Sequence, residues 1–343
     1  MRAVVYSESG PPSVLHLVDR DTSEPGPGEV RVRVARSGVN PTDWKVRRGA
    51  VPGQGLAFPE MVPDQDGSGV VDAVGPGVDR LAVGDRVWML LAAHQRPTGT
   101  AQELTVLPQE RVIPLPDGAD FDLGAALGVP AVTAHRALTT SEDGPSRLSP
   151  GALSDATVLV AGGAGAVGNS AIQLANWAGA RVISTVSSEE KAALATAAGA
   201  HHVVDYTEGD TAAKIREIAP DGVDIVVEVA PAQNLALDLA VVRLRGTIAI
   251  YANNGGDQVT LNVRETFSLN VRLQFVLLYT IGDAALRAAT EDVNTAVAAG
   301  ALGVGEDRGV PVHHFPLERA ADAHQAVEDG IIGRVLIDVS DDL

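Results

Sequence analysis

One stretch constrains the fold of this chain more than any other: an apolar run that turns through glycines directly into a helix. Residues 157–161 read Thr-Val-Leu-Val-Ala, and apolar residues then recur at positions 167, 171, 174, 175 and 178. The first pattern predicts a buried strand and the second an amphipathic helix. Between them, Gly163, Gly165 and Gly168 satisfy the spacing G-x-G-x-x-G. A strand, a glycine turn and a helix in this order predict a dinucleotide-binding site.

These glycines suit the chemistry of a pyrophosphate. They permit a tight turn, close approach of the backbone to the ligand, and close packing of the helix on the strand. The phosphates would bind the free N–H groups at the start of the helix, where the helix dipole favours negative charge. We therefore predict cofactor contacts from Gly163, Gly165, Ala166, Val167 and Gly168.

The next strand indicates which dinucleotide binds. It is predicted over 180–186 and ends in Ser187-Ser188, without the carboxylate that usually holds the ribose 2′-hydroxyl of NAD(H). Ser187 and Lys191 suit a 2′-phosphate instead, and Lys191 is one of only three lysines in the chain. These residues predict NADP(H) as the cofactor. The alternative for Lys191 is a solvated lysine on a helix surface.

Length and composition exclude several classes of protein. A chain of 343 residues should form two domains, and a net charge of −18 argues against nucleic acid or an anionic membrane surface as a partner. The apolar runs are too short to span a bilayer. Residues 1–6 already read as a strand, so we expect no signal peptide and a cytoplasmic protein. The absence of cysteine excludes disulfides, thiol catalysis and Cys-ligated zinc.

The pattern changes along the chain. Residues 1–120 predict a β-rich, barrel-like domain, with strands at 30–34, 69–74 and 85–90 separated by Gly/Pro turns. A helix is expected at 125–138, and a polar loop without evident chemistry at 140–155.

Strands and helices then alternate, as in a doubly wound α/β domain with a parallel sheet. The strands are predicted at 180–186, 202–206, 223–230 and 246–251, and the helices at 189–198, 210–219 and 232–243. For the tail we predict a strand at 267–279, a helix at 284–299, an extended segment at 311–316, a helix at 317–328 and a last strand at 334–339.

Several motifs together resemble the medium-chain dehydrogenase/reductase superfamily, and within it the zinc-free quinone oxidoreductases related to ζ-crystallin. They are Gly38-Val39-Asn40-Pro41-Thr42-Asp43-Trp44, Gly67 to Gly75, Val83-Gly84-Asp85-Arg86-Val87, Gly99-Thr100-Ala101-Gln102-Glu103, Val129 to Ala134, the glycine turn, Phe315-Pro316-Leu317 and Gly333-Arg334-Val335. The resemblance implies a GroES-like catalytic domain built from 1–123 and 271–343. An NADP(H)-binding Rossmann domain at 124–270 is then inserted between these two parts. It also implies a homodimer.

The resemblance implies a metal-free site as well. Zinc relatives have a cysteine where Asn40 stands, and a Gly-His-Glu segment where this chain has Pro63-Asp64-Gln65-Asp66-Gly67. Relatives also hold the 2′-phosphate of NADPH with a lysine and a tyrosine at the positions of Lys191 and Tyr206. The alternative for Tyr206 is a rim residue without a ligand.

Hydride transfer to a carbonyl compound needs a donor for the oxygen on which negative charge develops. Asn40 is the donor we predict, and the alternative is a turn asparagine that bonds its own backbone. Lys45 could supply the proton, and Thr133 corresponds to a residue that contacts the nicotinamide or its ribose in relatives. Ala230, Tyr251 and Asn253 stand at or just past strand ends, where a parallel sheet binds ligands.

Trp44, Val51 and His94 are predicted to line the substrate pocket, and His94 and His135 are the histidines expected near the cleft. The leading hypothesis is an NADPH-dependent reductase of a small-molecule carbonyl compound or quinone. One alternative is an enoyl-thioester reductase of fatty-acid or polyketide type, with Arg47 and Arg48 as the available basic residues. The other is an NADPH-binding structural or regulatory protein.

Overall fold

The computed structural model describes residues 1–49, 56–340 and 343, which divide into two compact units. Unit 1 comprises Met1–Val129 and Val312–Leu343, and unit 2 comprises Pro130–Pro311. Both boundaries lie further along the chain than the predicted 123/124 and 270/271: residues 124–129 belong to unit 1, and residues 271–311 belong to unit 2. Within the described ranges, no helix is both long and apolar enough to cross a membrane.

Unit 2 is built on a parallel sheet with the strand order β10-β9-β8-β11-β12-β13. Every neighbouring pair in this order runs parallel. The order reverses between β8 and β11, so the predicted doubly wound Rossmann fold is confirmed. The strands are β8 (Thr157–Ala161), β9 (Arg181–Val186), β10 (His202–Asp205), β11 (Val223–Glu228), β12 (Val242–Ile250) and β13 (Arg272–Phe275).

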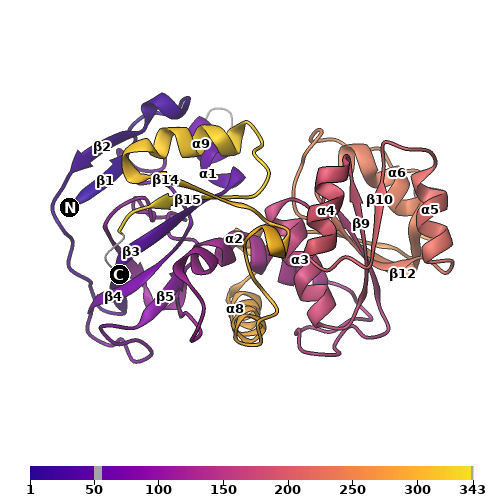
Figure 1. Cartoon of the computed structure of the whole chain (residues 1–343), viewed down its shortest axis with the longest axis horizontal. Coiled ribbons are helices and arrows are strands. Elements are labelled where there is room, and N and C mark those ends of the chain that lie inside the picture. The colour runs from indigo at the N-terminus through magenta and orange to yellow at the C-terminus, as the bar shows by residue number, and fades with distance from the viewer. Residues whose placement is uncertain (50–55, 341–342) are drawn as a thin grey trace. The chain divides into compact units, whose positions relative to one another are not determined.

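Helices cover both faces of this sheet, which is why its central strands are mostly buried and largely apolar. Figure 1 shows α3 (Ala166–Trp177) and α4 (Glu189–Ala197) on one side of the strands, and α5 (Thr211–Ile218) and α6 (Pro231–Val241) on the other. The core between these layers includes fully buried side chains such as Ile183, Val226 and Ile248.

The strand predicted at 267–279 is wrong in its first part. The chain there forms α7 (Val263–Ser268), then β13 and a short 3₁₀ turn at Leu278–Thr280. The helix begins because the Asn262 side-chain oxygen accepts the N–H groups of Arg264 and Glu265. The sequence pattern missed this cap. The predicted helix at 284–299 is present as α8 (Asp283–Ala298).

Unit 1 is β-rich, and segments from the two ends of the chain share one sheet. Its order is β14-β15-β3-β4-β5-β7, with β6 paired to β3, while β1 pairs with β2. The strands are β1 (Arg2–Val5), β2 (His16–Asp19), β3 (Glu29–Val39), β4 (Asp66–Val74), β5 (Arg86–Met89), β6 (Leu104–Pro108), β7 (Val112–Pro114), β14 (Val312–Pro316) and β15 (Arg334–Asp338). This is the GroES-like fold that the resemblance implied.

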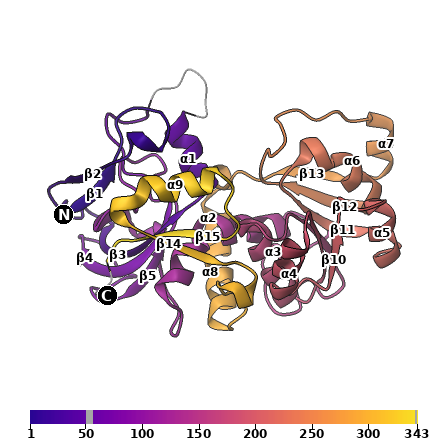
Figure 2. The ribbon, with the colours of Figure 1, turned by 45° about the horizontal axis from the view of Figure 1, so that its top comes forward.

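Two short helices complete unit 1. Figures 1 and 2 show α9 (Ala320–Glu328) lying over β14 and β15 and beside α1 (Pro41–Arg48). Beneath them, alternate residues of β3 are fully buried, among them Val30, Val32 and Val34. The helix α2 (Phe121–Leu138) begins in unit 1 and ends in unit 2.

Candidate functional site

The turn after β8 is closed by contacts that only glycine permits. Gly162 has a φ of +68°, in the left-handed region that favours glycine. A Cβ on Gly163 would lie 2.1 Å from the Ser184 hydroxyl oxygen, and one on Gly168 would lie 2.4 Å from the Gly162 carbonyl oxygen. Gly163 and Gly168 therefore allow the turn to pack on β9 and α3 to pack on the turn. The sharp bend itself falls one residue before the first predicted glycine.

The start of α3 is open to an anion. Gly165 is the N-cap and offers no side chain to the first turn. A Cβ there would meet a single described atom, the Gly162 carbonyl oxygen at 3.3 Å. The N–H groups of Ala166, Val167 and Gly168 are the first of the helix and have no partner within it. This cradle fits a pyrophosphate, as the glycine pattern predicted.

Ser187, Lys191 and Tyr206 gather at the carboxyl ends of β9 and β10. Lys191, in the first turn of α4, donates from Nζ to the Ser187 hydroxyl at 2.9 Å. Tyr206 follows β10 directly, donates its backbone N–H to the Val186 carbonyl at 3.0 Å, and has a side chain that is 53% exposed. The fold thus brings a cation, a hydroxyl and a phenol to one corner of the sheet edge.

The ends of β11 and β12 lie at the same edge. Tyr251 donates its N–H to the Glu228 carbonyl at 3.0 Å, and burial together with the Glu228 charge raises the pKa of its hydroxyl. The Ala230 N–H donates to the Glu228 carboxylate, and the Asn253 amide donates to Asp257. Ala230, just past β11, therefore lies beside the point between β8 and β11 where the strand order reverses, and Tyr251 follows the next strand, β12. Such sheets bind ligands at this point.

In unit 1, Asn40 stands where three strands of the sheet meet. It is the N-cap of α1 and is 1% exposed. Its amide nitrogen donates to Asp66 Oδ2 at 2.8 Å, and Arg334 Nη1 donates to its Oδ1 at 2.8 Å. Its second amide contact, to the Gly38 carbonyl, is 3.4 Å long and therefore weak. Asp43 completes the turn by accepting the Asn40 backbone N–H at 2.7 Å.

Asp66 joins Asn40 to α2. Both of its carboxylate oxygens accept the Val129 N–H at 2.9 Å, and Arg334 Nη2 lies 3.8 Å from Oδ2. A Cβ on Gly128 would lie only 2.1 Å from Asp66 Oδ1, so the helix approaches the carboxylate closely. Burial raises the pKa of Asp66 to about 7, although Arg334 and the Asn40 amide favour its charged form.

A second buried group of side chains surrounds Asp64. Its Oδ1 lies 3.0 Å from His324 Nε2, and its Oδ2 accepts the Ser37 hydroxyl at 2.8 Å. Burial, and then the charges of Asp64 and Asp66, raise the pKa of Asp43 well above its usual value. Unit 1 thus holds several carboxyls away from water beside Asn40.

The predicted substrate-pocket residues are only partly defined. Lys45 Nζ lies 5.8 Å from the centre of the Trp44 ring on α1, a cation–π distance. Val51 falls outside the described residues. The carbonyl of His94 accepts Arg111 Nη1 at 2.8 Å, and burial together with Arg111 lowers the pKa of its ring. Their role in substrate binding stays a prediction.

The chain resembles known proteins over its whole length. Residues 26–117 match the alcohol dehydrogenase GroES-like domain family, and residues 166–295 match the zinc-binding dehydrogenase family. Quinone oxidoreductase of Rattus norvegicus is 32% identical over 98% of this chain and 97% of its own length. The chain belongs to the quinone oxidoreductase family of the medium-chain dehydrogenase/reductases.

It is accordingly an oxidoreductase of the quinone oxidoreductase type. A second relative, 2-haloacrylate reductase of a Burkholderia species, is 31% identical over 95% of this chain and 94% of its own length. The crystal structure of Escherichia coli quinone oxidoreductase complexed with NADPH matches with a TM-score of 0.80 and 25% identity, covering 98% of this chain and 99% of that one.

One of the matching families is named for zinc, but the described part of this chain offers no evident ligand set. The sequence has no cysteine. Over the described ranges, no three His, Asp or Glu side chains converge as metal ligands. Where zinc relatives have a cysteine, the Asn40 amide is bonded to Asp66 and Arg334.

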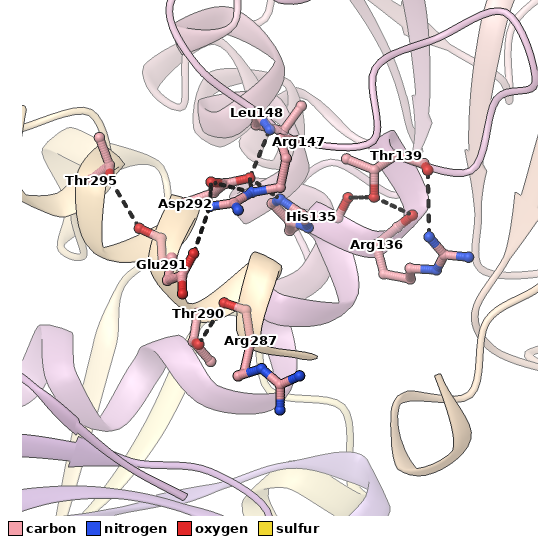
Figure 3. Close-up of polar contacts among 10 residues, drawn as sticks. All are labelled: His135, Arg136, Thr139, Arg147, Leu148, Arg287, Thr290, Glu291, Asp292 and Thr295. Carbon is pink, nitrogen blue, oxygen red and sulfur yellow. Dashed lines mark hydrogen bonds and ion pairs between the residues drawn. The ribbon is translucent and has the colours of Figure 1, made fainter. Parts of the chain in front are cut away.

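The imidazole ring of His135 contacts the carboxylate of Asp292. Figure 3 shows its ring beside the Asp292 carboxylate, with His135 Nε2 2.8 Å from Asp292 Oδ2. Arg147 Nε and the Leu148 N–H donate to the same carboxylate at 2.9 and 2.7 Å. Asp292 on α8 therefore fixes both α2 and the 140–155 loop, for which the sequence indicated no chemistry.

The predicted catalytic residues come from both units. Thr133, two residues before His135, is 5% exposed and belongs to unit 2, whereas Asn40 and Lys45 belong to unit 1.

The sequence analysis did not identify a buried acidic pair at the carboxyl edge of the unit 2 sheet, Glu228 and Asp238. Both occupy core positions: Glu228 ends β11 after three buried apolar residues, and Asp238 shares the inner face of α6 with Leu235 and Val241. Acidic residues at positions where the pattern demands apolar ones are the signal that could have identified them.

Proposed function

We propose that this protein is an NADPH-dependent, metal-independent reductase that transfers hydride to a quinone or an α,β-unsaturated carbonyl compound. The observation that carries the cofactor choice is the contact between Lys191 Nζ and the Ser187 hydroxyl at the tip of β9. A lysine and a hydroxyl there suit a 2′-phosphate, whereas an NAD(H) enzyme usually has a carboxylate at that tip. The NADPH in the Escherichia coli relative supports the same choice.

The residues present fit the whole dinucleotide. The first N–H groups of α3 would hold the pyrophosphate, Ser187, Lys191 and Tyr206 the 2′-phosphate, and the turn at Ala230 the nicotinamide half. When bound, the reduced nicotinamide supplies the hydride. Ala230, Tyr251 and Asn253 would orient it from the ends of β11 and β12.

We propose that the Asn40 amide donates a hydrogen bond to the oxygen of the hydride acceptor. One amide N–H is committed to Asp66 at 2.8 Å, but the other makes only the weak 3.4 Å contact to the Gly38 carbonyl and would be the donor to the acceptor oxygen. Arg334, bonded to Asn40 Oδ1, fixes the amide so that its nitrogen is the donor. Thr133 would contact the nicotinamide or its ribose, and Lys45 would return the proton.

Two observations favour this proposal over an enoyl-thioester reductase. Such an enzyme would use basic residues to hold the phosphate of its thioester carrier, and Arg47 and Arg48 are the local candidates. Arg47 is fully buried and donates to Glu328 at 2.9 Å, and Arg48 pairs with the same carboxylate. Neither arginine therefore presents an unpaired charge to a carrier.

We further propose that the protein acts as a cytoplasmic homodimer. Support for a dimer comes from the edge strand β13 and the segments beside it. Several large apolar side chains are exposed there: Phe275 is 66% exposed, Leu277 57% and Phe267 61%. Exposed apolar side chains along an unpaired strand edge are typical of a surface that pairs with another chain. The acidic composition without cysteine supports the cytoplasm.

The test is NADPH oxidation by the purified protein, followed by absorbance with three acceptors: a quinone, 2-chloroacrylate as the enone-like acid, and an enoyl-thioester. We expect turnover with at least one of the first two and little with the thioester. A clear preference for the thioester would favour the fatty-acid or polyketide alternative. NADPH binding without turnover of any acceptor would favour the structural or regulatory one.

A further inference from the structure

Two carboxyl groups with no part in the proposed hydride transfer lie beneath the turn that follows β11. Glu228 is 0% exposed and Asp238 is 1% exposed. The Glu228 carboxylate accepts the Ala230 N–H and, at 3.1 Å, the Asn234 side-chain amide. The Asp238 carboxyl lies beside that of Glu228, close enough to share a proton with it, and its Oδ2 accepts no hydrogen bond from the described residues.

The Glu228–Asp238 pair favours a state with a single negative charge. Two carboxylates in contact and away from water repel each other, so such a pair retains a proton. Both donors from the α6 side point at Glu228, which makes Glu228 the carboxylate and leaves the proton on Asp238. Burial raises the pKa of both groups, and the Glu228 charge raises that of Asp238 further.

Among the residues that the structure describes, the elements packed around the pair supply no compensating cation. Just past β12, the group that faces the pair is the Tyr251 hydroxyl. On α5, Lys214 Nζ donates to the Glu208 carbonyl and Arg216 Nε to the Ala240 carbonyl. Arg243 at the start of β12 pairs with Asp224.

The pair lies at the point where the strand order of the sheet reverses. Glu228 bonds Ala230 through its carboxylate and Tyr251 through its carbonyl, so it fixes the ends of both β11 and β12. We propose that Glu228 and Asp238, sharing one proton, are positioning residues that hold the Val229–Ala230 turn for the nicotinamide half of the dinucleotide. This rests on the proposed function. Loss of the proton would set two like charges against each other and displace the turn.

The experiment is a fluorescence titration of NADPH at pH 7 to 9.5, above the second pKa of a phosphate monoester at about 6. In the unmodified protein, the Kd should rise with pH by up to about tenfold per unit once the shared proton begins to leave. Asp238→Asn keeps a donor toward Glu228 but cannot ionise, so its Kd should stay flat over this range. Lys214→Ala, a control away from the pair, should keep the unmodified profile.

Glu228→Gln provides a second variant in case Asp238→Asn does not fold, and its Kd should likewise stay flat with pH. For both variants, the melting temperature is measured over the same pH range and compared with the Kd profile. If they change only the melting temperature and keep the unmodified Kd profile, the pair is merely structural and the inference is overturned. If the unmodified protein binds NADPH at pH 7 with a Kd that does not rise with pH, the inference also fails while the proposed function stands. Failure of the unmodified protein to bind NADPH at any pH would overturn both.

Discussion

Lys191 is the residue on which the choice between NADPH and NADH depends, because only NADPH carries the extra phosphate. Lys191→Ala should raise the Michaelis constant for NADPH by about tenfold or more, since a hydrogen bond to a charged group contributes about 1.5–3 kcal/mol. The constant for NADH should change little. Lys214→Ala is the matched control, because that lysine lies on α5 and binds a backbone carbonyl. Equal effects of Lys191→Ala on both cofactors would make Lys191 a surface lysine.

Asn40 is the proposed hydrogen-bond donor to the oxygen on which negative charge develops. Removing one donor from a developing oxyanion typically lowers turnover by about 10²–10³. Asn40→Ala should do so while NADPH affinity stays close to that of the unmodified protein. It should also lower the melting temperature, because Arg334 and Asp66 lose their shared partner. Turnover that is unchanged well below the melting temperature would show that the amide serves only the turn.

At the scale of elements, Asp292 joins α8 to α2 and to the 140–155 loop. Burial alone would raise its pKa, but His135, Arg147 and the Leu148 N–H together lower the pKa to about 2. A carboxyl with a lowered pKa stabilises the fold above its unfolded pKa of about 4, here by about 2 kcal/mol, and loses that contribution as the pH falls toward 2.

Asp292→Asn should therefore lower the free energy of unfolding at pH 7 by about 2 kcal/mol, the contribution that the lowered pKa of Asp292 makes to stability. It should also flatten the loss of stability between pH 5 and 3. Urea unfolding over this pH range measures both effects. The control is Glu291→Gln, since Glu291 pairs with Arg147 from an exposed position where a pair contributes about 1 kcal/mol or less. Similar effects of the two substitutions would contradict the assignment.

The elements also show where the sequence was sufficient. Most strands and helices of unit 2 followed from apolar periodicity, because its central strands are covered on both faces and its helices on one. The first part of the strand predicted at 267–279 was misread because the Asn262 cap, a local hydrogen bond, outweighed the strand-like pattern. Ser187 and Lys191 were predicted from the end of one strand and the start of the next helix, whereas Tyr206 was implied by the resemblance. The Asn40–Asp66–Arg334 and Glu228–Asp238 contacts could not be predicted, because they join residues that are distant in sequence or stand at apolar positions.

At the scale of the whole molecule, a first prediction concerns metal content. If Asn40 replaces a zinc ligand, purified protein should contain no stoichiometric zinc and should keep its activity after dialysis against a chelator. Elemental analysis and the NADPH oxidation assay check this. One zinc per chain, with activity lost on its removal and restored by its return, would contradict the metal-independent proposal.

A second whole-molecule prediction concerns the β13 edge. Replacing Phe275 by Arg places a charge where the proposed dimer would bury an aromatic ring, so the protein should shift toward the monomer in sedimentation velocity. Val83→Arg is the control, because Val83 is similarly exposed, at 64%, but belongs to unit 1 and not to the β13 edge. A monomeric unmodified protein, or equal shifts in both variants, would count against the dimer.

The sheet of unit 1 also has a consequence for how the chain is made. β15 lies between β14 and β3, and Arg334 on β15 completes the contacts of Asn40 and Asp66. On the ribosome, all of unit 2 is therefore synthesised while β3 still lacks β15 beside it and Asp66 still lacks the Arg334 guanidinium. Unit 2 can fold early, whereas unit 1 has to wait with an open apolar edge until β14, α9 and β15 emerge. The polar environment of Asn40 is thus among the last parts of the nascent protein to form.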